Sequence, residues 1–450
     1  MSFSAPRISV LSLSLLTALT LAGHAQAAKP SKAPAKTAAQ PQGPVELSLS
    51  HQLDDTRVSR LQEVVDRFNG QQKDYKVSLV RRGDGGGSYH MNLALREELS
   101  QFVSGKETYR PLFQVISESK EKVDPARLAP ELRSGVTDAK GRLLALPVAF
   151  STPVLFYSKS AFRRAGLDPE APPKTWWEVQ AVAGKLFEAG VKCPYTTSRP
   201  AWVHIDNLAA RNNVETVGEK GEMAFNGMMQ VKHVALLNSW VKASYFHNFG
   251  GQDQADSHFV SGECGMITTG SDRYATFRDH RDLDVGVAPL PYYDDAYGAP
   301  RRTLVDGASL WVGSGHQTPQ YKGVARFVAF LMAPDMQVEI AHGGGYLPLT
   351  AAAQSAARSK LLKDDMRNIE VAQLQLGAAP AAVSKAAAQN PSVSRIDPVR
   401  RIIDEELEQV WANKKPAKLA LDNAVTRANA VLRSGTAAKL AEAPASSKVR

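Results

Sequence analysis

Apolar and polar positions alternate at the start of the region that we expect to fold. Residues 45–49 place an apolar side chain at every second position, which predicts a half-buried strand. Residues 55–70 carry apolar residues at helical spacing and end in glycine, and Val77 and Leu79 mark a second strand. Strand, helix and strand within about 35 residues predict a βαβ unit with parallel strands. Ligands bind at the carboxyl ends of such strands, so the loop around His51 is a candidate wall of a site.

The same reasoning extends along the chain. Residues 143–157 are apolar and interrupted by prolines, which predicts two buried strands separated by a bend. Thr175 and Glu178 form a capping-box pattern ahead of a helix that we expect to end at Gly190. Strands and helices alternate to about residue 350, and apolar faces at helical spacing finish the chain. The pattern predicts an α/β protein of about two lobes with a helical C-terminal part. Further helices are expected at 321–332, 403–411 and 421–432.

Both ends of the chain differ from this middle. Residues 1–27 combine Arg7, an apolar run and an Ala-Gln-Ala pattern, which is typical of a secretory signal peptide. Residues 28–44 read as a flexible linker, and residues 436–450 as a disordered tail. No other stretch approaches the roughly 20 apolar residues of a transmembrane helix. We therefore expect an exported, periplasmic protein.

Cysteine count and charge add two expectations. Cys193 and Cys264 are the only cysteines, and export permits a disulfide between them, although two buried thiols fit the sequence equally well. The formal net charge of +9 suggests a general attraction for anions. No basic stripe with interleaved aromatic residues appears, so we expect no nucleic-acid partner.

A search for catalytic chemistry gives no reaction. The sequence contains no H-E-x-x-H, G-x-S-x-G, Walker A or CxxC motif, and its histidines are scattered. We therefore expect no enzyme, no metal and no cofactor. The glycines of residues 82–90 are able to cradle a phosphate with backbone N–H groups, but they fit an ordinary flexible loop as well.

Several longer strings resemble one known family. The string STPVLFYSKSAFRRAGLDPEAPPKTWWEV at 151–179 is similar to the second-lobe entry of the solute-binding proteins that serve ABC importers. Taken together and in order, the strings most resemble the periplasmic family that captures glycerol-3-phosphate. The others are GVKCPY at 190–195, FVSGECGM at 259–266, DGASLWV at 306–312, GGYLPLT at 344–350 and RRIIDEELEQVW at 400–411.

This resemblance implies a periplasmic-binding-protein fold, in which two α/β lobes joined by hinge strands close on a ligand. The first lobe would comprise residues 45–149 and 301–346, and the second lobe residues 150–300 and 347–435. The implied partners are a phosphorylated polyol and the membrane permease subunits of an ABC importer. A monomer is expected.

The resemblance also implies a ligand-binding site. Arg400 and the backbone N–H of Gly307 would hold the phosphate, because an arginine fork pairs well with phosphate oxygens. Glu118 would hold the glycerol hydroxyls, and Trp202 would stack on the carbon backbone. The full expected set is Tyr89, Glu118, Ser151, Trp202, Ser271, Gly307, Tyr346 and Arg400.

Three departures from the family leave the ligand open. Arg199 stands where the family has tryptophan, Gly270 stands at a family serine and is followed by Ser271, and Asp306 replaces a family glycine. Glycerol-3-phosphate, a glycerophosphodiester or another polyol phosphate all fit. A carbohydrate-binding protein of the same fold, a sensor or adhesin, and a secreted phosphodiester hydrolase are the rival hypotheses.

Overall fold

The computed structural model describes residues 43–53, 55–83, 87–95, 109–133, 136–138, 140–219, 221–377 and 396–441. The predicted signal peptide and nearly all of the predicted linker lie outside these ranges, as do residues 442–450 of the predicted tail.

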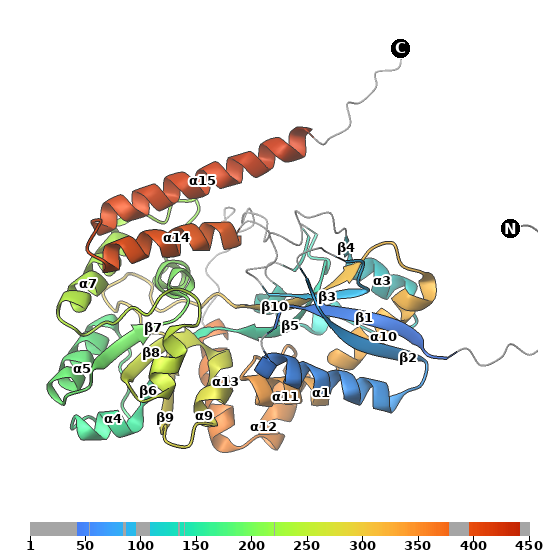
Figure 1. Ribbon diagram of the computed structural model, residues 1–450, viewed down its shortest axis with the longest axis horizontal. Helices are drawn as coiled ribbons and strands as arrows, with labels where there is room; N and C mark the ends of the chain where they lie inside the picture. The colour runs from blue at the N-terminus through green and yellow to red at the C-terminus, as the bar shows by residue number, and fades with distance from the viewer. Residues whose placement is uncertain are drawn as a thin grey trace, which may run out of the picture. The chain divides into compact units, whose positions relative to one another are not determined.

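Six strands form the first sheet, in the order β2-β1-β3-β10-β4 with β5 also paired to β10 (Figure 1). Strand β1 is parallel to β2 and β3, so the predicted βαβ unit is confirmed. Strand β10 runs antiparallel to β3, β4 and β5. The strands are β1 (Val45–His51), β2 (Tyr75–Arg81), β3 (Met91–Ala94), β4 (Tyr109–Arg110), β5 (Leu146–Ser151) and β10 (Asp306–Gly313).

Four strands form the second sheet, in the order β7-β8-β6-β9. Strands β7 and β8 are parallel, and β6 is antiparallel to both of its neighbours. The strands are β6 (Pro153–Ser158), β7 (Cys193–Thr197), β8 (Cys264–Gly270) and β9 (Val285–Pro289).

A disulfide joins the first residues of two neighbouring strands. Cys193 in β7 and Cys264 in β8 are partners in the parallel register and are bonded through sulfur. The sequence left this pairing open because it does not show which strands are neighbours. The bond closes a segment of 71 residues within the second sheet.

The chain passes between the sheets at Thr152. This residue alone separates β5 of the first sheet from β6 of the second, as the predicted bend between two buried strands requires. Its hydroxyl bonds the hydroxyl of Thr303, which lies on the segment that returns from β9 to β10. Two crossing segments are therefore tied to each other between the sheets.

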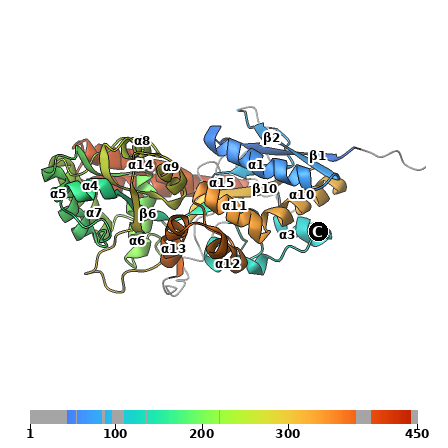
Figure 2. The same cartoon turned by 90° about the horizontal axis from the view of Figure 1, so that it is seen from below.

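Helices cover each sheet and bury a separate core against it (Figures 1 and 2). Around the first sheet lie α1 (Asp55–Gln71), α3 (Leu112–Glu118), α10 (Thr318–Leu331) and α11 (Pro334–Gly344). Around the second lie α4 (Lys159–Arg164), α5 (Trp176–Glu188), α6 (Leu208–Arg211), α7 (Met228–Lys242), α8 (Ala255–Val260) and α9 (Tyr274–Arg278). Helices α12 (Ala351–Lys360) and α13 (Lys363–Gly377) follow α11, and α13 contacts β6 and β9.

Two helices end the described chain beside the second sheet, where Figure 1 shows them in red. Helix α14 (Ile396–Trp411) buries the predicted face that includes Ile403 and Leu407, and α15 (Ala417–Ala441) packs on α14 and α7. Helix α15 extends to Ala441, beyond the helix expected at 421–432, so the first residues of the predicted disordered tail are helical.

Candidate functional site

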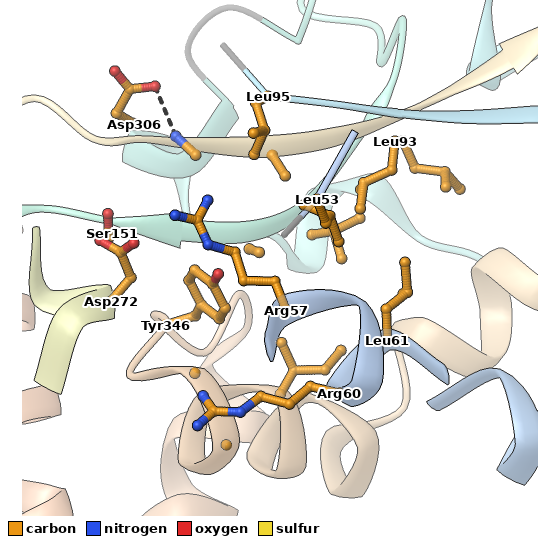
Figure 3. A pocket seen from close by; sticks show the side chains of 18 of the residues that line it. Leu53, Arg57, Arg60, Leu61, Leu93, Leu95, Ser151, Asp272, Asp306 and Tyr346 are labelled. Carbon is orange, nitrogen blue, oxygen red and sulfur yellow. Dashed lines mark hydrogen bonds between the residues drawn. The ribbon is translucent and has the colours of Figure 1, made fainter. Parts of the chain in front are cut away.

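A cleft of about 950 Å³ lies between the part of the chain built on the first sheet and the part built on the second (Figure 3). Its apolar wall comes from β1, α1, β10, α10 and the segment between β1 and α1, and it includes Leu53, Leu61 and Leu310. Its polar wall includes Ser151, Arg199, Asp272, Arg273, Asp306, Arg400 and Asp404. Gln52 and Leu53 follow directly after His51, so the carboxyl end of a parallel strand contributes to the cleft as expected.

Five of the eight predicted site residues line this cleft. Ser151 ends β5 and Gly307 is the second residue of β10, and these strands are paired so that Ser151 faces Asp306. Gly307 has φ of +147°, and a Cβ there would lie 2.0 Å from the carbonyl oxygen of Ala149, so no other residue fits. The full set is Ser151, Trp202, Gly307, Tyr346 and Arg400.

Tyr346 enters the cleft from the end of α11, where Figure 3 shows its ring beside Arg57. The helix ends at Gly345, which adopts the left-handed conformation typical of helix C-termini and turns the chain toward the cleft. Burial raises the pKa of the Tyr346 hydroxyl, so this group remains a neutral donor at physiological pH.

Trp202 lies on a π-helical turn, η4 (Ala201–Asn207), and is almost fully buried. The backbone N–H of Ala201 donates to Asp404 Oδ1 at 2.8 Å, which fixes the start of this turn to α14. The indole Nε1 has no hydrogen-bond partner within the described residues. A π-helical turn is uncommon and often marks a functional site, which is consistent with its position on the cleft wall.

A network of hydrogen-bonded, buried polar side chains connects His204 of η4 to the core of the second half. His204 Nε2 lies 3.2 Å from the Tyr195 hydroxyl, and His204 Nδ1 lies 3.0 Å from His233 Nε2. His233 Nδ1 in turn lies 2.8 Å from the Tyr293 hydroxyl. Burial lowers the pKa of His204 to about 3, and burial together with the unfavourable interaction between two protonated imidazoles lowers the pKa of His233 as well. Both imidazoles are therefore neutral at physiological pH.

The other three predicted residues do not line the cleft. Glu118 ends α3 on the surface and pairs with Arg110 at 2.6 Å. Ser271 is buried beside the crossing segment, where its backbone N–H donates to the Thr152 carbonyl oxygen at 2.9 Å. The structure therefore gives Ser271 a contact to the crossing segment, while the next residue, Asp272, reaches the cleft.

Tyr89 lies in the glycine-rich segment 82–90, whose residues 84–86 fall outside the described part of the chain. Its ring packs on Gly87, where an added Cβ would lie 2.6 Å from the ring, and its carbonyl oxygen accepts from His316 Nε2 at 3.0 Å. The described residues of this segment are not among those that line the cleft.

Arg400 is held by two carboxylates. Its Nε and Nη2 both lie 2.8 Å from Asp206 Oδ2, and its Nη1 pairs with Asp306 Oδ2. Burial lowers the pKa of Arg400, but the two carboxylates outweigh burial and raise it overall. Sequence reasoning placed Arg400 in the site but missed both partners.

A second group of charged side chains lies at the same cleft. It is centred on Arg199, one of the departures from the family that left the ligand open. Arg199 Nε donates to Asp253 Oδ1 at 2.8 Å, and Arg57 and Arg273 also pair with Asp253. Burial raises the pKa of Asp253, but these arginines outweigh it and hold that pKa well below its usual range. Asp272 completes the group through Arg199 at 3.5 Å and Arg273 at 3.3 Å.

Asp404 is a cleft residue that sequence reasoning missed, although it lies one helical turn after Arg400 in the quoted RRIIDEELEQVW string. Burial raises its pKa to about 7. Among the described residues, no helix is long and apolar enough to cross a membrane, and no cluster of three or more His, Cys, Asp or Glu side chains suits a metal ion.

Comparison with known proteins gives consistent matches. The family model of bacterial extracellular solute-binding proteins matches residues 63–368. The sn-glycerol-3-phosphate-binding periplasmic protein UgpB of Yersinia pseudotuberculosis is 34% identical over 416 residues, which cover 86% of this chain and 92% of that relative. The protein of the same name from Salmonella typhimurium is 34% identical over 408 residues, covering 85% and 91%.

Solved structures share the fold at lower identity. UgpB from Mycobacterium tuberculosis in complex with glycerophosphocholine matches with a TM-score of 0.70 and 19% identity, over 88% of this chain and 100% of that one. The cyclic alpha-maltosyl-1,6-maltose binding protein from Arthrobacter globiformis matches with a TM-score of 0.66 and 20% identity, over 87% and 100%. The predicted two-lobed periplasmic-binding-protein fold is thereby confirmed.

Proposed function

The chain belongs to the bacterial extracellular solute-binding proteins, and from this membership we propose that it captures a glycerol phosphate in the periplasm and delivers it to an ABC importer. The observation that carries the proposal is the cleft itself. It gathers an arginine, two hydroxyl groups, an aromatic ring and a strained glycine, all at positions expected from the resemblance. The names of the relatives that are 34% identical along most of the chain point to the same ligand class.

Each of these groups has a role that suits a small phosphorylated polyol. Arg400 offers a planar fork of N–H donors for phosphate oxygens. The hydroxyls of Ser151 and Tyr346 and the N–H of Gly307 complete the polar shell. Trp202 offers an apolar face for the carbon backbone of the ligand.

Lobe closure is the proposed mechanism. The expected boundary after residue 149 shifts to Thr152, because Phe150 and Ser151 belong to β5 of the first sheet. The lobes are then the parts built on the two sheets, and they hinge where Thr152 and Thr303 are bonded. Because each lobe supplies part of the polar shell, the ligand binds the closed form better and shifts the population toward it. The closed form then docks on the permease subunits.

The protein acts in this proposal as a monomeric carrier and not as an enzyme. A solute-binding protein has to release its ligand unchanged, so the groups around the phosphate bind it and transfer no proton or electron pair. Incubation with a glycerophosphodiester should therefore leave that compound intact, as phosphorus NMR measures directly.

Calorimetry with purified protein tests the ligand class. We expect binding of glycerol-3-phosphate or of a glycerophosphodiester and no heat from maltose. Binding of maltose together with no response to any glycerol phosphate would replace this proposal with a carbohydrate carrier of the same fold. A melting-temperature screen gives an independent reading, because a ligand that binds only the native state raises that temperature.

A further inference from the structure

Asp306 occupies two of the donors that an anionic ligand needs. Its Oδ1 accepts from the backbone N–H of Gly307 at 2.7 Å, the bond drawn as a dashed line in Figure 3. Its Oδ2 pairs with Arg400 Nη1. Gly307 and Arg400 are the two groups assigned above to the ligand phosphate, so a carboxylate of the protein stands where phosphate oxygens would bind.

The remaining nitrogens of Arg400 are also engaged. Nε and Nη2 both lie 2.8 Å from Asp206 Oδ2. Two carboxylates around one guanidinium leave one negative charge in excess, and the side chain of Asp306 is only 10% exposed, so water screens this charge weakly. An incoming phosphate therefore has to displace Asp306 from its donors, and the carboxylates next to Arg400 repel it.

This repulsion depends on the charge of the ligand. A phosphate monoester carries nearly two negative charges above about pH 7, because its second pKa lies near 6. A phosphodiester carries one. Exchange of the Asp306 carboxylate for a diester at Arg400 preserves the charge next to the guanidinium, whereas exchange for a monoester adds a second negative charge.

We infer that Asp306 is a specificity-determining residue that competes with the ligand for Arg400 and the Gly307 N–H, and that it makes this cleft select monoanionic glycerophosphodiesters over dianionic glycerol monophosphates. The inference deepens the proposed function and rests on it. Asp306 replaces a glycine of the family that this chain resembles, and a glycine has no side chain to compete.

The test compares two ligands that differ in charge at phosphorus. Glycerophosphoglycerol is a diester whose second alcohol is uncharged, and glycerol-3-phosphate is the matching monoester. At about pH 8 we expect the wild-type protein to bind the diester at least about tenfold more tightly by calorimetry. This comparison requires no substitution, so it remains informative if a variant folds poorly.

Asp306→Asn removes the charge and retains the shape, and Asp306→Gly vacates the position. Both should tighten binding of the monoester by at least about tenfold relative to the diester. Asp284→Asn, which alters an exposed aspartate paired with Arg163, is the matched control and should change neither affinity. Asp206→Asn tests whether loss of a negative charge beside Arg400 is sufficient. Because Asp206 makes no contact to the Gly307 N–H, we expect a smaller change in the preference between monoester and diester than for the Asp306 variants.

Equal preference of the wild-type protein for both ligands, or an unchanged preference in both Asp306 variants, would overturn the inference while the proposed function stands. An equal shift in Asp206→Asn would overturn the competition for donors. If the wild-type protein binds neither ligand, the proposed function fails, and the inference fails with it.

Discussion

The guanidinium of Arg57 lies 3.0 Å from the carboxylate of Asp253, and this ion pair connects the two sides of the cleft. Arg57 projects from α1, which covers the first sheet, and Asp253 lies in the segment before α8, which packs on the second. Arg60, one helical turn after Arg57, approaches Asp279 to 3.9 Å in the same direction. Helix α1 therefore contributes charged contacts between the two halves, in addition to the pair of Arg400 with Asp306.

Arg57→Gln should shift the protein toward the open form and weaken ligand binding about fivefold, because a partly buried ion pair between the halves is worth roughly 1 kcal/mol. Calorimetry measures the affinity, and small-angle X-ray scattering measures the radius of gyration of the ligand-free protein. Arg81→Gln is the matched control, since Arg81 pairs with Asp55 within the first half and is 60% exposed. An unchanged affinity and radius in Arg57→Gln would remove this contact from closure.

Arg400→Gln should weaken glycerol phosphate binding at least about tenfold, because a charge-assisted hydrogen-bond partner of the phosphate is lost. The same variant should unfold more easily, by about 3 kcal/mol, since Asp206 and Asp306 lose the charge that compensates their burial. Calorimetry and denaturant titration measure the two effects. Arg164→Gln, at an exposed position of α4, should alter neither. A dissociation constant that stays at the wild-type value would exclude Arg400 from the site.

The sequence predicted those elements that depend on local chemistry. The capping box formed as expected, with Thr175 Oγ1 accepting from the Glu178 N–H at 3.1 Å and the Glu178 carboxylate accepting from the Thr175 N–H. The bend at Thr152 and the parallel pairing of β1 with β2 were equally accessible, because each follows from residues that are close in sequence or from one repeating pattern.

Long-range charge pairing was not accessible in the same way. Arg400 meets partners 194 and 94 residues away, and Arg199 meets Asp253 54 residues further on. The neighbouring sequence does not distinguish an arginine that is paired with carboxylates from one that is available to bind a ligand. The difference depends on which carboxylates the fold places beside it. The family resemblance identified Arg400 and Gly307 as phosphate-binding candidates. Only the structure shows that Asp306 contacts both of them.

Trp202→Phe should abolish the change in tryptophan fluorescence that ligand binding produces. Trp202 is the cleft tryptophan and Arg199 lies 5.9 Å from its ring centroid, so closure around a ligand alters its electrostatic surroundings directly. Trp177→Phe is the matched control, because Trp177 is 46% exposed and is not among the residues that line the cleft. A full ligand-induced change that survives in Trp202→Phe would show that the signal arises elsewhere.

Removal of the disulfide should destabilise the protein by about 4 kcal/mol, because reduction releases a closed loop of 71 residues in the unfolded chain. Guanidinium unfolding of Cys193→Ala/Cys264→Ala against the oxidised wild type measures this difference. The reduced wild type should resemble the double variant, which serves as the control for lost packing. Equal midpoints for all three proteins would show that the bond contributes no stability.

The buried histidines His204 and His233 predict how stability depends on pH. Both have pKa values below the usual 6.5, chiefly because of burial, and that of His204 falls to about 3. Below about pH 6.5 these two histidines become protonated in the unfolded chain but remain neutral in the folded protein. The stability that these neutral histidines contribute is therefore fully present above that pH and is lost as the pH falls below it, by about 1.4 kcal/mol per pH unit for each histidine. For His204 the loss continues to about pH 3.

Denaturant unfolding at intervals between about pH 7 and 5 measures this slope. His233→Gln should reduce the slope by about one proton, because a glutamine takes up no proton in either state, even though its loss of contacts to His204 and Tyr293 lowers stability at every pH. His247→Gln is the matched control, since the described imidazole hydrogen bond of His247 goes to the Ser244 carbonyl oxygen and not to a side chain of the network. Identical slopes in His233→Gln and the wild type would mean that His233 titrates in the folded protein, which would contradict its burial as a neutral group beneath the cleft.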